Sequence, residues 1–310
     1  KINYMEIMET LCDELTYNIS DNELGKYIKQ ITNTPIQEIN PDLQGEQQDL
    51  PKDEKIKHEI DKIIKETCET DEDKETLINE IIVLQERVTE LMKSRRGLPF
   101  YGLLARWFDT RDIIHIMNEH EILITSVLED VIPYIHKNNI YKLYRLTMEQ
   151  LIESNQGIVN QIIEIFMNAS PCEYKNLVAK MFIPSEEDRN EKGEVSTKPI
   201  LCVEMCDLHN DRWKNMGLKW LEPCCGKGNF ILEMFDRLYL NLDIEDEEEK
   251  CEYIIEECLY FVDINELNVF ICEVLLVAQA WSYTGTWKQD YKFNSKVCTY
   301  TIFHIRTPLY

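Results

Sequence analysis

The ten residues Leu221–Phe230, which read LEPCCGKGNF, decide the fold of the second half of this chain. An acid and a proline open the segment, and Gly226 and Gly228 stand one residue apart. Apolar residues then recur at helical spacing, namely Phe230, Ile231, Met234, Phe235 and Leu238. The pattern predicts a strand, a tight glycine turn and a helix. Such a junction presents backbone N–H groups and the positive end of a helix to nucleotide-like ligands, although two glycines also form ordinary turns.

A second strand follows in the segment Cys258–Asp263 and ends in an acid. A new helical pattern comes directly after it, starting at Leu267. An acid at the end of the second strand of a nucleotide-binding domain typically binds ribose hydroxyls. The intervening stretch Asp243–Glu257 contains nine acids and one lysine, and we interpret it as a solvated acidic insertion.

These segments resemble the cofactor motifs of S-adenosylmethionine-dependent DNA methyltransferases, in particular the N6-adenine enzymes of the restriction-modification type. The resemblance covers residues 193–310 and implies a Rossmann-like domain with a mainly parallel sheet. Further strands normally follow in that family, so we expect an incomplete sheet here. The resemblance assigns the cofactor loop to Glu222, Pro223, Gly226 and Gly228, and the cofactor ribose to Asp263.

Two more segments extend the resemblance. Residues Gly193–Pro199 are similar to the family segment that contacts the methionine carboxylate, which implies a cofactor contact for Thr197. Ser196 stands where the family has an aromatic residue, and Lys198 intervenes before the proline. Asp290 matches an acid that the family places on the cofactor adenine.

The catalytic tetrapeptide of the family, Asn-Pro-Pro-aromatic, has a partial counterpart in Thr307–Tyr310. The resemblance implies that Thr307 and Pro308 accept hydrogen bonds from the target amine and that Tyr310 stacks on a flipped-out adenine. A threonine hydroxyl is shorter than an asparagine amide, and losing one positioned polar partner typically lowers a rate by about 10²–10³. The tetrapeptide can therefore also be read as an ordinary strand end.

The negative net charge of the chain disfavours binding of nucleic acid. The chain has 57 acidic and 33 basic residues and a net charge of −24, whereas affinity for DNA comes largely from Lys and Arg contacts with phosphate. We therefore expect DNA binding only with help from another domain or subunit.

Cysteine usage indicates an intracellular protein, either cytoplasmic or associated with a virion. The eleven cysteines are an odd number, and several lie on apolar faces, as expected for buried thiols in a reducing compartment. The clusters Cys202–His209 and Cys224–Cys225 lack the spacing that closes around zinc, so we predict no metal site. We predict no membrane span, because no run of 18 apolar residues occurs.

Residues 1–180 have few glycines and predict an all-α domain. A helical hairpin is expected near 54–95, with an a/d seam at Leu77, Ile81, Leu84, Val88 and Leu91. Thr70–Asp73 can cap its second helix. We expect this hairpin to contact a protein partner. We interpret Gly97–Gly102 as a turn, and Tyr101, Trp107 and Phe108 as core residues.

The sequence thus predicts an α-helical domain followed by an α/β domain. The first functional hypothesis is an adenine-N6 DNA methyltransferase that uses S-adenosylmethionine. The alternative is a catalytically inactive descendant, acting as a structural or regulatory subunit of a larger assembly such as a viral particle.

Overall fold

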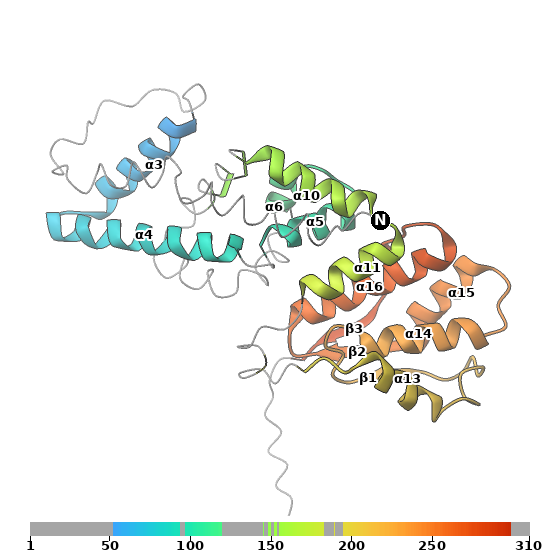
Figure 1. Ribbon diagram of the computed structural model, residues 1–310. Helices are drawn as coiled ribbons and strands as arrows, with labels where there is room; N and C mark the ends of the chain where they lie inside the picture. The colour runs from blue at the N-terminus through green and yellow to red at the C-terminus, as the bar shows by residue number, and fades with distance from the viewer. Residues whose placement is uncertain are drawn as a thin grey trace, which may run out of the picture. The chain divides into compact units, whose positions relative to one another are not determined.

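The computed structural model describes residues 52–93, 97–119, 145, 148–149, 152–153, 155–182, 189 and 195–298. Its contacts divide the chain into two units, Lys1–Asn168 and Ala169–Tyr310. The described part of the first unit is helical, and the second combines helices with a small parallel sheet (Figure 1). The domain boundary that the sequence predicts, near residue 180, lies inside the second of these units.

Two helices, α3 (Lys52–Thr67) and α4 (Asp71–Lys93), lie where the hairpin was expected. The start of α4 is capped reciprocally by Thr70 and Asp73, as the sequence predicted. The Asp73 N–H donates to Thr70 Oγ1 at 3.1 Å, and the Thr70 N–H donates to Asp73 Oδ2 at 2.9 Å. Leu77, Ile81 and Leu84 of the predicted seam are buried within the chain, which leaves little of their surface for a partner.

Three more helices of the first unit are α5 (Leu98–Trp107), α6 (Ile113–Glu119) and α10 (Gln156–Asn168). The interpretation of Gly97–Gly102 as a turn was wrong, because Gly102 lies inside α5. A Cβ atom added to Gly102 would lie 2.3 Å from the Phe166 ring of α10. The glycine therefore lets two helices approach closely. Tyr101 is buried, as expected, whereas Trp107 and Phe108 are half-buried.

Replacing Gly102 with alanine should destabilise the first unit, because Phe166 would have to move. We expect Gly102→Ala to lower the free energy of unfolding by about 1–3 kcal/mol, measured by urea denaturation. Gly157→Ala is the matched control, because nothing lies within 4 Å of its added Cβ, and alanine favours a helix over glycine by about 0.5–1 kcal/mol. Equal effects of the two substitutions would contradict this account of the α5–α10 contact.

The second unit contains a three-stranded parallel sheet with β2 in the centre. Its strands are β1 (Trp220–Glu222), β2 (Leu259–Asp263) and β3 (Asn294–Val297). Its helices are α11 (Pro171–Met181), α13 (Pro199–Asp207), α14 (Asn229–Asn241), α15 (Glu247–Tyr253), the π-helical turn η2 (Ile254–Cys258) and α16 (Glu266–Thr284). The second unit is therefore a small α/β arrangement, in agreement with the predicted fold class.

Parallel pairing brings the carboxyl ends of the strands to one edge. Trp220 pairs with Leu259 across β1 and β2, and Asp263 pairs with Val297 across β2 and β3. The ends of β1 and β2 therefore lie side by side, followed by the glycine turn and by α16. Ligands of open α/β sheets bind at this edge. Strand β3 was not predicted.

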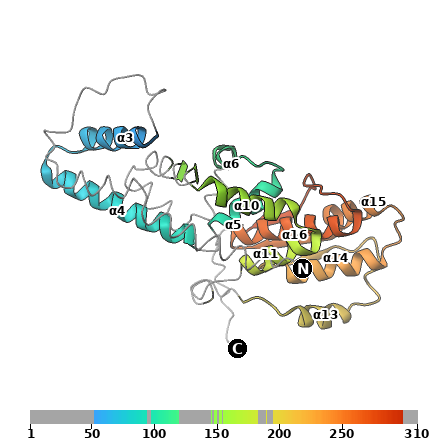
Figure 2. The same cartoon turned by 45° about the horizontal axis from the view of Figure 1, so that its top comes forward.

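Helix α16 forms the centre of this unit. Thirteen of its nineteen residues are buried, and it contacts α11, α14, α15 and the sheet. Figures 1 and 2 both show α11 alongside α16. Among the described residues, α16 is also the helix long and apolar enough to cross a membrane, but 72% of its apolar window is buried inside the protein.

The acidic stretch is only partly the solvated insertion that was predicted. Residues Glu247–Glu249 are exposed, and the Asp246 side chain caps α15 by accepting from the Glu249 N–H at 2.8 Å. Cys251, Ile254 and Ile255 are buried, however. The stretch therefore connects α14 to β2 and contributes to the core, because its apolar residues recur at helical spacing between the acids.

Glu273 is a half-buried acid on α16, and it accepts a hydrogen bond from Ser295 Oγ of β3 at 2.6 Å. Burial raises the pKa of the Glu273 carboxyl above its ordinary value. A raised folded-state pKa means that the folded protein binds this proton more tightly than the unfolded chain. The contribution of Glu273 to stability is therefore greatest at low pH and falls as pH rises through the folded-state pKa.

Glu273→Gln should accordingly stabilise the protein at neutral and alkaline pH, because glutamine keeps an acceptor for Ser295 without a buried charge. We expect its free energy of unfolding to exceed that of the unsubstituted protein at pH 8. The difference should shrink as pH falls toward 4, in denaturation series across that range. A variant less stable at pH 8 would show that the ionised carboxylate stabilises this contact.

Candidate functional site

The glycine turn between β1 and α14 has a conformation that favours glycine. Gly226 has φ +50° and Gly228 has φ +83°, both in the left-handed region. Gly228 is the residue before α14, and its carbonyl accepts from the Leu232 N–H at 2.9 Å. A side chain at Gly228 would also meet Cys272 of α16, whose Sγ lies 3.1 Å from an added Cβ. The turn is thus specified by backbone conformation and by packing.

Asp263 holds this turn against the end of β2. The Gly226 N–H donates to Asp263 Oδ2 at 2.8 Å, and the Asn265 N–H donates to Oδ1 at 2.9 Å. Asn268 Nδ2 lies 3.4 Å from the same Oδ1. The Cys225 N–H donates to the Val262 carbonyl at 2.9 Å. The two segments that the sequence assigned to one cofactor site are therefore in direct contact.

Glu222 closes the first part of the turn. Its Oε1 accepts from the Cys224 N–H at 3.1 Å. Glu222 is half-buried at the end of β1, and Pro223 is exposed beside it. Both residues lie at the same edge of the sheet as Asp263, since Glu222 pairs with Phe261 in β2.

Thr197 also reaches this turn. Asn229, the first residue of α14, donates from Nδ2 to the Thr197 carbonyl at 2.7 Å and to Ser196 Oγ at 3.0 Å. Pro199, which follows Thr197 by two residues, begins α13. The structure thus brings together six of the seven residues predicted to bind the cofactor, namely Thr197, Glu222, Pro223, Gly226, Gly228 and Asp263.

Asp290 is the exception. It precedes β3 by four residues and therefore lies toward the amino end of that strand, whereas Gly226 and Asp263 follow carboxyl ends. Its neighbours confirm the placement, because Lys288 Nζ pairs with Glu252 at 2.7 Å and the Lys292 N–H donates to Glu256 Oε1 at 3.0 Å, close to the start of β2. The predicted contact of Asp290 with the cofactor adenine does not fit this arrangement.

Two buried thiols, those of Cys225 and Cys272, lie at the glycine turn. Cys272 Sγ of α16 donates to the Gly226 carbonyl at 3.3 Å, and Cys272 also hydrogen-bonds with Cys225. Burial is the main cause that raises the pKa of the Cys272 thiol well above its ordinary value. A thiol held in the protonated form is a poor nucleophile, so we interpret Cys272 as a structural residue.

Sequence reasoning missed the contributions of Asn229, Asn268 and Cys272. Asn229 directly follows the second glycine, and Asn268 lies five residues after Asp263 on the first turn of a helix. Both could have been recognised from the sequence as polar residues close to the carboxyl ends of the predicted strands. Cys272 gave no signal, because an apolar helical face does not reveal which residue faces the glycine turn.

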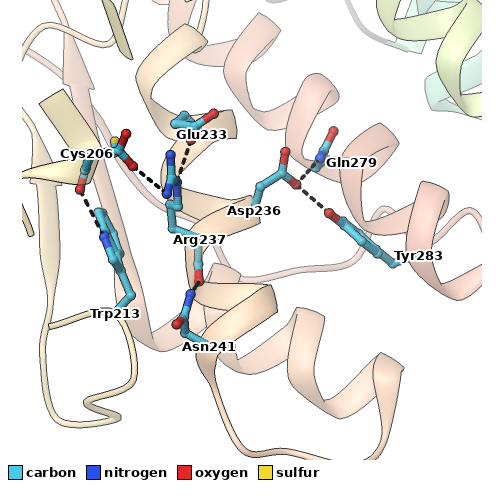
Figure 3. A network of polar contacts seen from close by, with 9 residues as sticks. Cys206, Trp213, Glu233, Asp236, Arg237, Asn241, Gln279 and Tyr283 are labelled. Atoms are coloured by element: carbon cyan, nitrogen blue, oxygen red, sulfur yellow. Dashed lines mark hydrogen bonds and ion pairs between the residues drawn. The ribbon is translucent and has the colours of Figure 1, made fainter. Parts of the chain in front are cut away.

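Helix α14 is fixed on two sides, which positions the turn at its start. Arg237 pairs with Glu233 and with Asp207 of α13, each at 2.7 Å. Asp236 accepts from Gln279 and, at 2.8 Å, from the Tyr283 hydroxyl, both on α16. Figure 3 shows Arg237 and Asp236 directed toward different neighbours from adjacent positions.

The predicted catalytic residues Thr307, Pro308 and Tyr310 lie outside the described residues, and their roles stay predictions. Within the described ranges, no group of three His, Cys, Asp or Glu side chains could hold a metal ion. The cysteines in these ranges are free thiols, most of them buried. Burial raises the pKa of Cys206 to about 11.

No protein-family model matches the chain, and no curated protein matches it. A cryo-EM structure described as a DrdV–DNA complex is similar at 15% sequence identity, with a TM-score of 0.38. The match covers 92% of this chain and 24% of that one, so the chain spans about a quarter of the length of this neighbour.

The two glycines of the turn should differ in their tolerance of a side chain. Gly226→Ala adds only left-handed strain, about 1–2 kcal/mol, because its Cβ would lie in open space. Gly228→Ala adds a similar backbone strain and also a close contact with Cys272. It should therefore destabilise the second unit more than Gly226→Ala does. Thermal and urea unfolding of both variants would check this order, and the reverse order would contradict the packing described here.

Proposed function

We propose that the carboxyl edge of β1 and β2 binds S-adenosylmethionine. The observation that carries the proposal is the direct contact between the glycine turn and Asp263, two segments that the sequence matched separately to one cofactor site. The placement of Thr197 beside the same turn supports it.

The residues at this edge have the chemistry that such a ligand needs. Neither Gly226 nor Gly228 carries a side chain that would block approach to the backbone. Asp263 accepts from the Gly226 N–H on Oδ2 and from the Asn265 N–H and Asn268 Nδ2 on Oδ1, and a carboxylate offers about four acceptor positions in all. The second position on Oδ2 can therefore accept a ribose hydroxyl without releasing the turn. Because Asp290 lies elsewhere, the adenine group would be held by other residues.

In the proposed reaction, the bound cofactor supplies an activated methyl group, and the acceptor is the N6 amine of an adenine flipped out of DNA. Thr307 and Pro308 would accept hydrogen bonds from the amine, and Tyr310 would stack on the base, which contributes about 1–3 kcal/mol. A net charge of −24 means that the DNA contact needs basic residues of another domain or subunit.

A second function is favoured by one observation, the threonine at position 307 where the family has asparagine. With this substitution the chain would keep the fold and lose the chemistry. It would then serve as a structural or regulatory subunit of a larger assembly. Cofactor binding and methyl transfer are separate properties and need separate tests.

Cofactor binding is tested by calorimetric titration of S-adenosylmethionine into the purified chain. We expect Asp263→Ala to weaken binding at least tenfold, because it removes both the ribose acceptor and the anchor of the turn. Asp290→Ala is the matched control, an exposed acid at the other end of the sheet, and should leave affinity unchanged. Asp263→Asn, which keeps an acceptor for Gly226, should lie between the two. Unchanged affinity in Asp263→Ala would exclude the proposed site.

Methyl transfer is tested with radiolabelled cofactor and adenine-containing DNA. If the chain is an enzyme limited by its tetrapeptide, Thr307→Asn should raise the rate by about 10²–10³, because it restores the amide acceptor. If neither protein transfers methyl groups at a saturating concentration of DNA while both bind the cofactor, the non-enzymatic function is favoured.

A further inference from the structure

The parallel sheet of the second unit has helices on one of its faces. Helices α14 and α16 contact each other, and both contact β2. Leu259 and Phe261 of β2 are almost fully buried. Ser295 of β3, the register partner of Phe261, donates to Glu273 of α16. Because side chains alternate along a strand, these residues mark the face that the helices cover.

The opposite face is open in the part of the chain that the structure describes. Leu221 of β1 is 61% exposed, and Tyr260 and Val262, which alternate with the buried residues of β2, are half-buried. Leu221 pairs with Tyr260, and the exposed Lys296 pairs with Val262, so these side chains share one face. Parallel sheets are almost always covered on both faces. Another element is therefore expected to pack here.

This open face carries positive charge. Lys219, directly before β1, donates to the Tyr260 hydroxyl at 2.6 Å, and its Nζ lies 5.0 Å from the centre of that ring. Because the phenol is neutral, the contact positions Lys219 without removing its charge. The described strand residues of this face include Lys296 and no acid, although Glu257 lies near Lys219. An element that suits this face has an apolar surface and a carboxylate.

Helix α13 offers a surface of that kind, because it is apolar on two sides. Cys202 and Cys206 are buried, and the helix packs on α14. The other side is exposed and consists of four apolar residues and one acid, namely Ile200, Leu201, Glu204, Met205 and Leu208. Steps of one, three and four residues place them on one continuous face. Figures 1 and 2 both show α13 at the periphery of the second unit.

The two surfaces agree in size. Strands spaced about 4.8 Å apart give a three-stranded face about 10 Å across, and the five residues of β2 extend about 16 Å. Helix α13 has nine residues, so it is about 14 Å long and, with its side chains, about 10–12 Å wide. A single helix of these dimensions covers the open face.

We propose that copies of this chain associate, with the exposed side of α13 in one copy packed on the open sheet face of another. Leu221 and Tyr260 would contact the apolar residues of the helix, and Glu204 would lie near Lys296. Each copy carries both surfaces, so the same contact made in the reverse direction closes a dimer. The proposal does not rest on the proposed function, since it uses other side chains and requires no cofactor.

Charge disfavours two other occupants of the sheet face. Two copies packed sheet to sheet would bring Lys219 and Lys296 of one copy toward the same lysines of the other, and like charges repel. Single-stranded nucleic acid would stack on an aromatic ring, but Lys219 already lies over the Tyr260 ring. The net charge of −24 also repels nucleic acid.

Association is tested by sedimentation velocity of the purified chain over a wide series of concentrations. One chain has a mass of 36.8 kDa. We expect a dimer or a larger assembly whose fraction increases with concentration. A single species of 36.8 kDa throughout the series would overturn the proposal.

The two surfaces are tested with matched variants. Leu221→Asp on the sheet face and Leu208→Asp at the end of α13 should each abolish association, and an equimolar mixture of the two should recover part of it. Leu240→Asp is the control, because Leu240 is 73% exposed on α14 and belongs to neither surface. All three positions are exposed, so the melting temperatures should change little. Association that depends on only one of the two surfaces would contradict the proposed contact.

The charge pairing is tested in the same assay, with substitutions at exposed positions that do not alter the core. Glu204→Lys should weaken association about fivefold, as expected for an exposed ion pair. Adding Lys296→Glu to the same chain should recover the affinity, because the two charges are exchanged. A double variant weaker than Glu204→Lys alone would show that α13 does not pack on this face of the sheet.

Discussion

The hydrogen bond from the Gly226 N–H to Asp263 Oδ2 is the contact on which the arrangement of the second unit depends. It joins the turn after β1 to the end of β2, and α14 and α16 begin directly after these two points. The left-handed conformation of Gly226 and Gly228 allows the chain to turn in the space available above Cys272. The Asp263 carboxylate thus stabilises the fold of this unit and is also part of the candidate site.

The helices around this contact limit how far the turn can move. Arg237 joins α14 to α13, and Asp236 joins α14 to α16. Asn229, at the first position of α14, links the helix to the segment that holds Thr197. A ligand at the carboxyl edge would therefore meet a largely preformed site, which reduces the entropic cost of binding.

The sequence predicted the parts of this site that depend on local rules. A glycine turn after a short strand, an acid at the end of the next strand and the Thr70–Asp73 cap all follow from backbone conformation and hydrogen bonding within a few residues. The glycine turn at Gly226 and Gly228, and the position of Asp263 at the end of a strand, could therefore be predicted before the structure was known.

The errors concern contacts between segments distant in sequence. Gly102 was read as part of a turn because the close approach of Phe166 is not visible in the sequence around the glycine. Asp290 was matched to the acid that the family places on the cofactor adenine, whereas the unexpected strand β3 places it toward the other end of the sheet. The acidic stretch hid the buried residues Ile254 and Ile255 because charge dominates its composition.

Hydrogen–deuterium exchange with and without S-adenosylmethionine tests the central claim most directly, because it reports where the ligand acts. The account predicts slower exchange of backbone amides at 222–229 and 263–268 when the cofactor is added, with no change at 286–292. Unchanged exchange at the glycine turn, or protection confined to the region around Asp290, would contradict it.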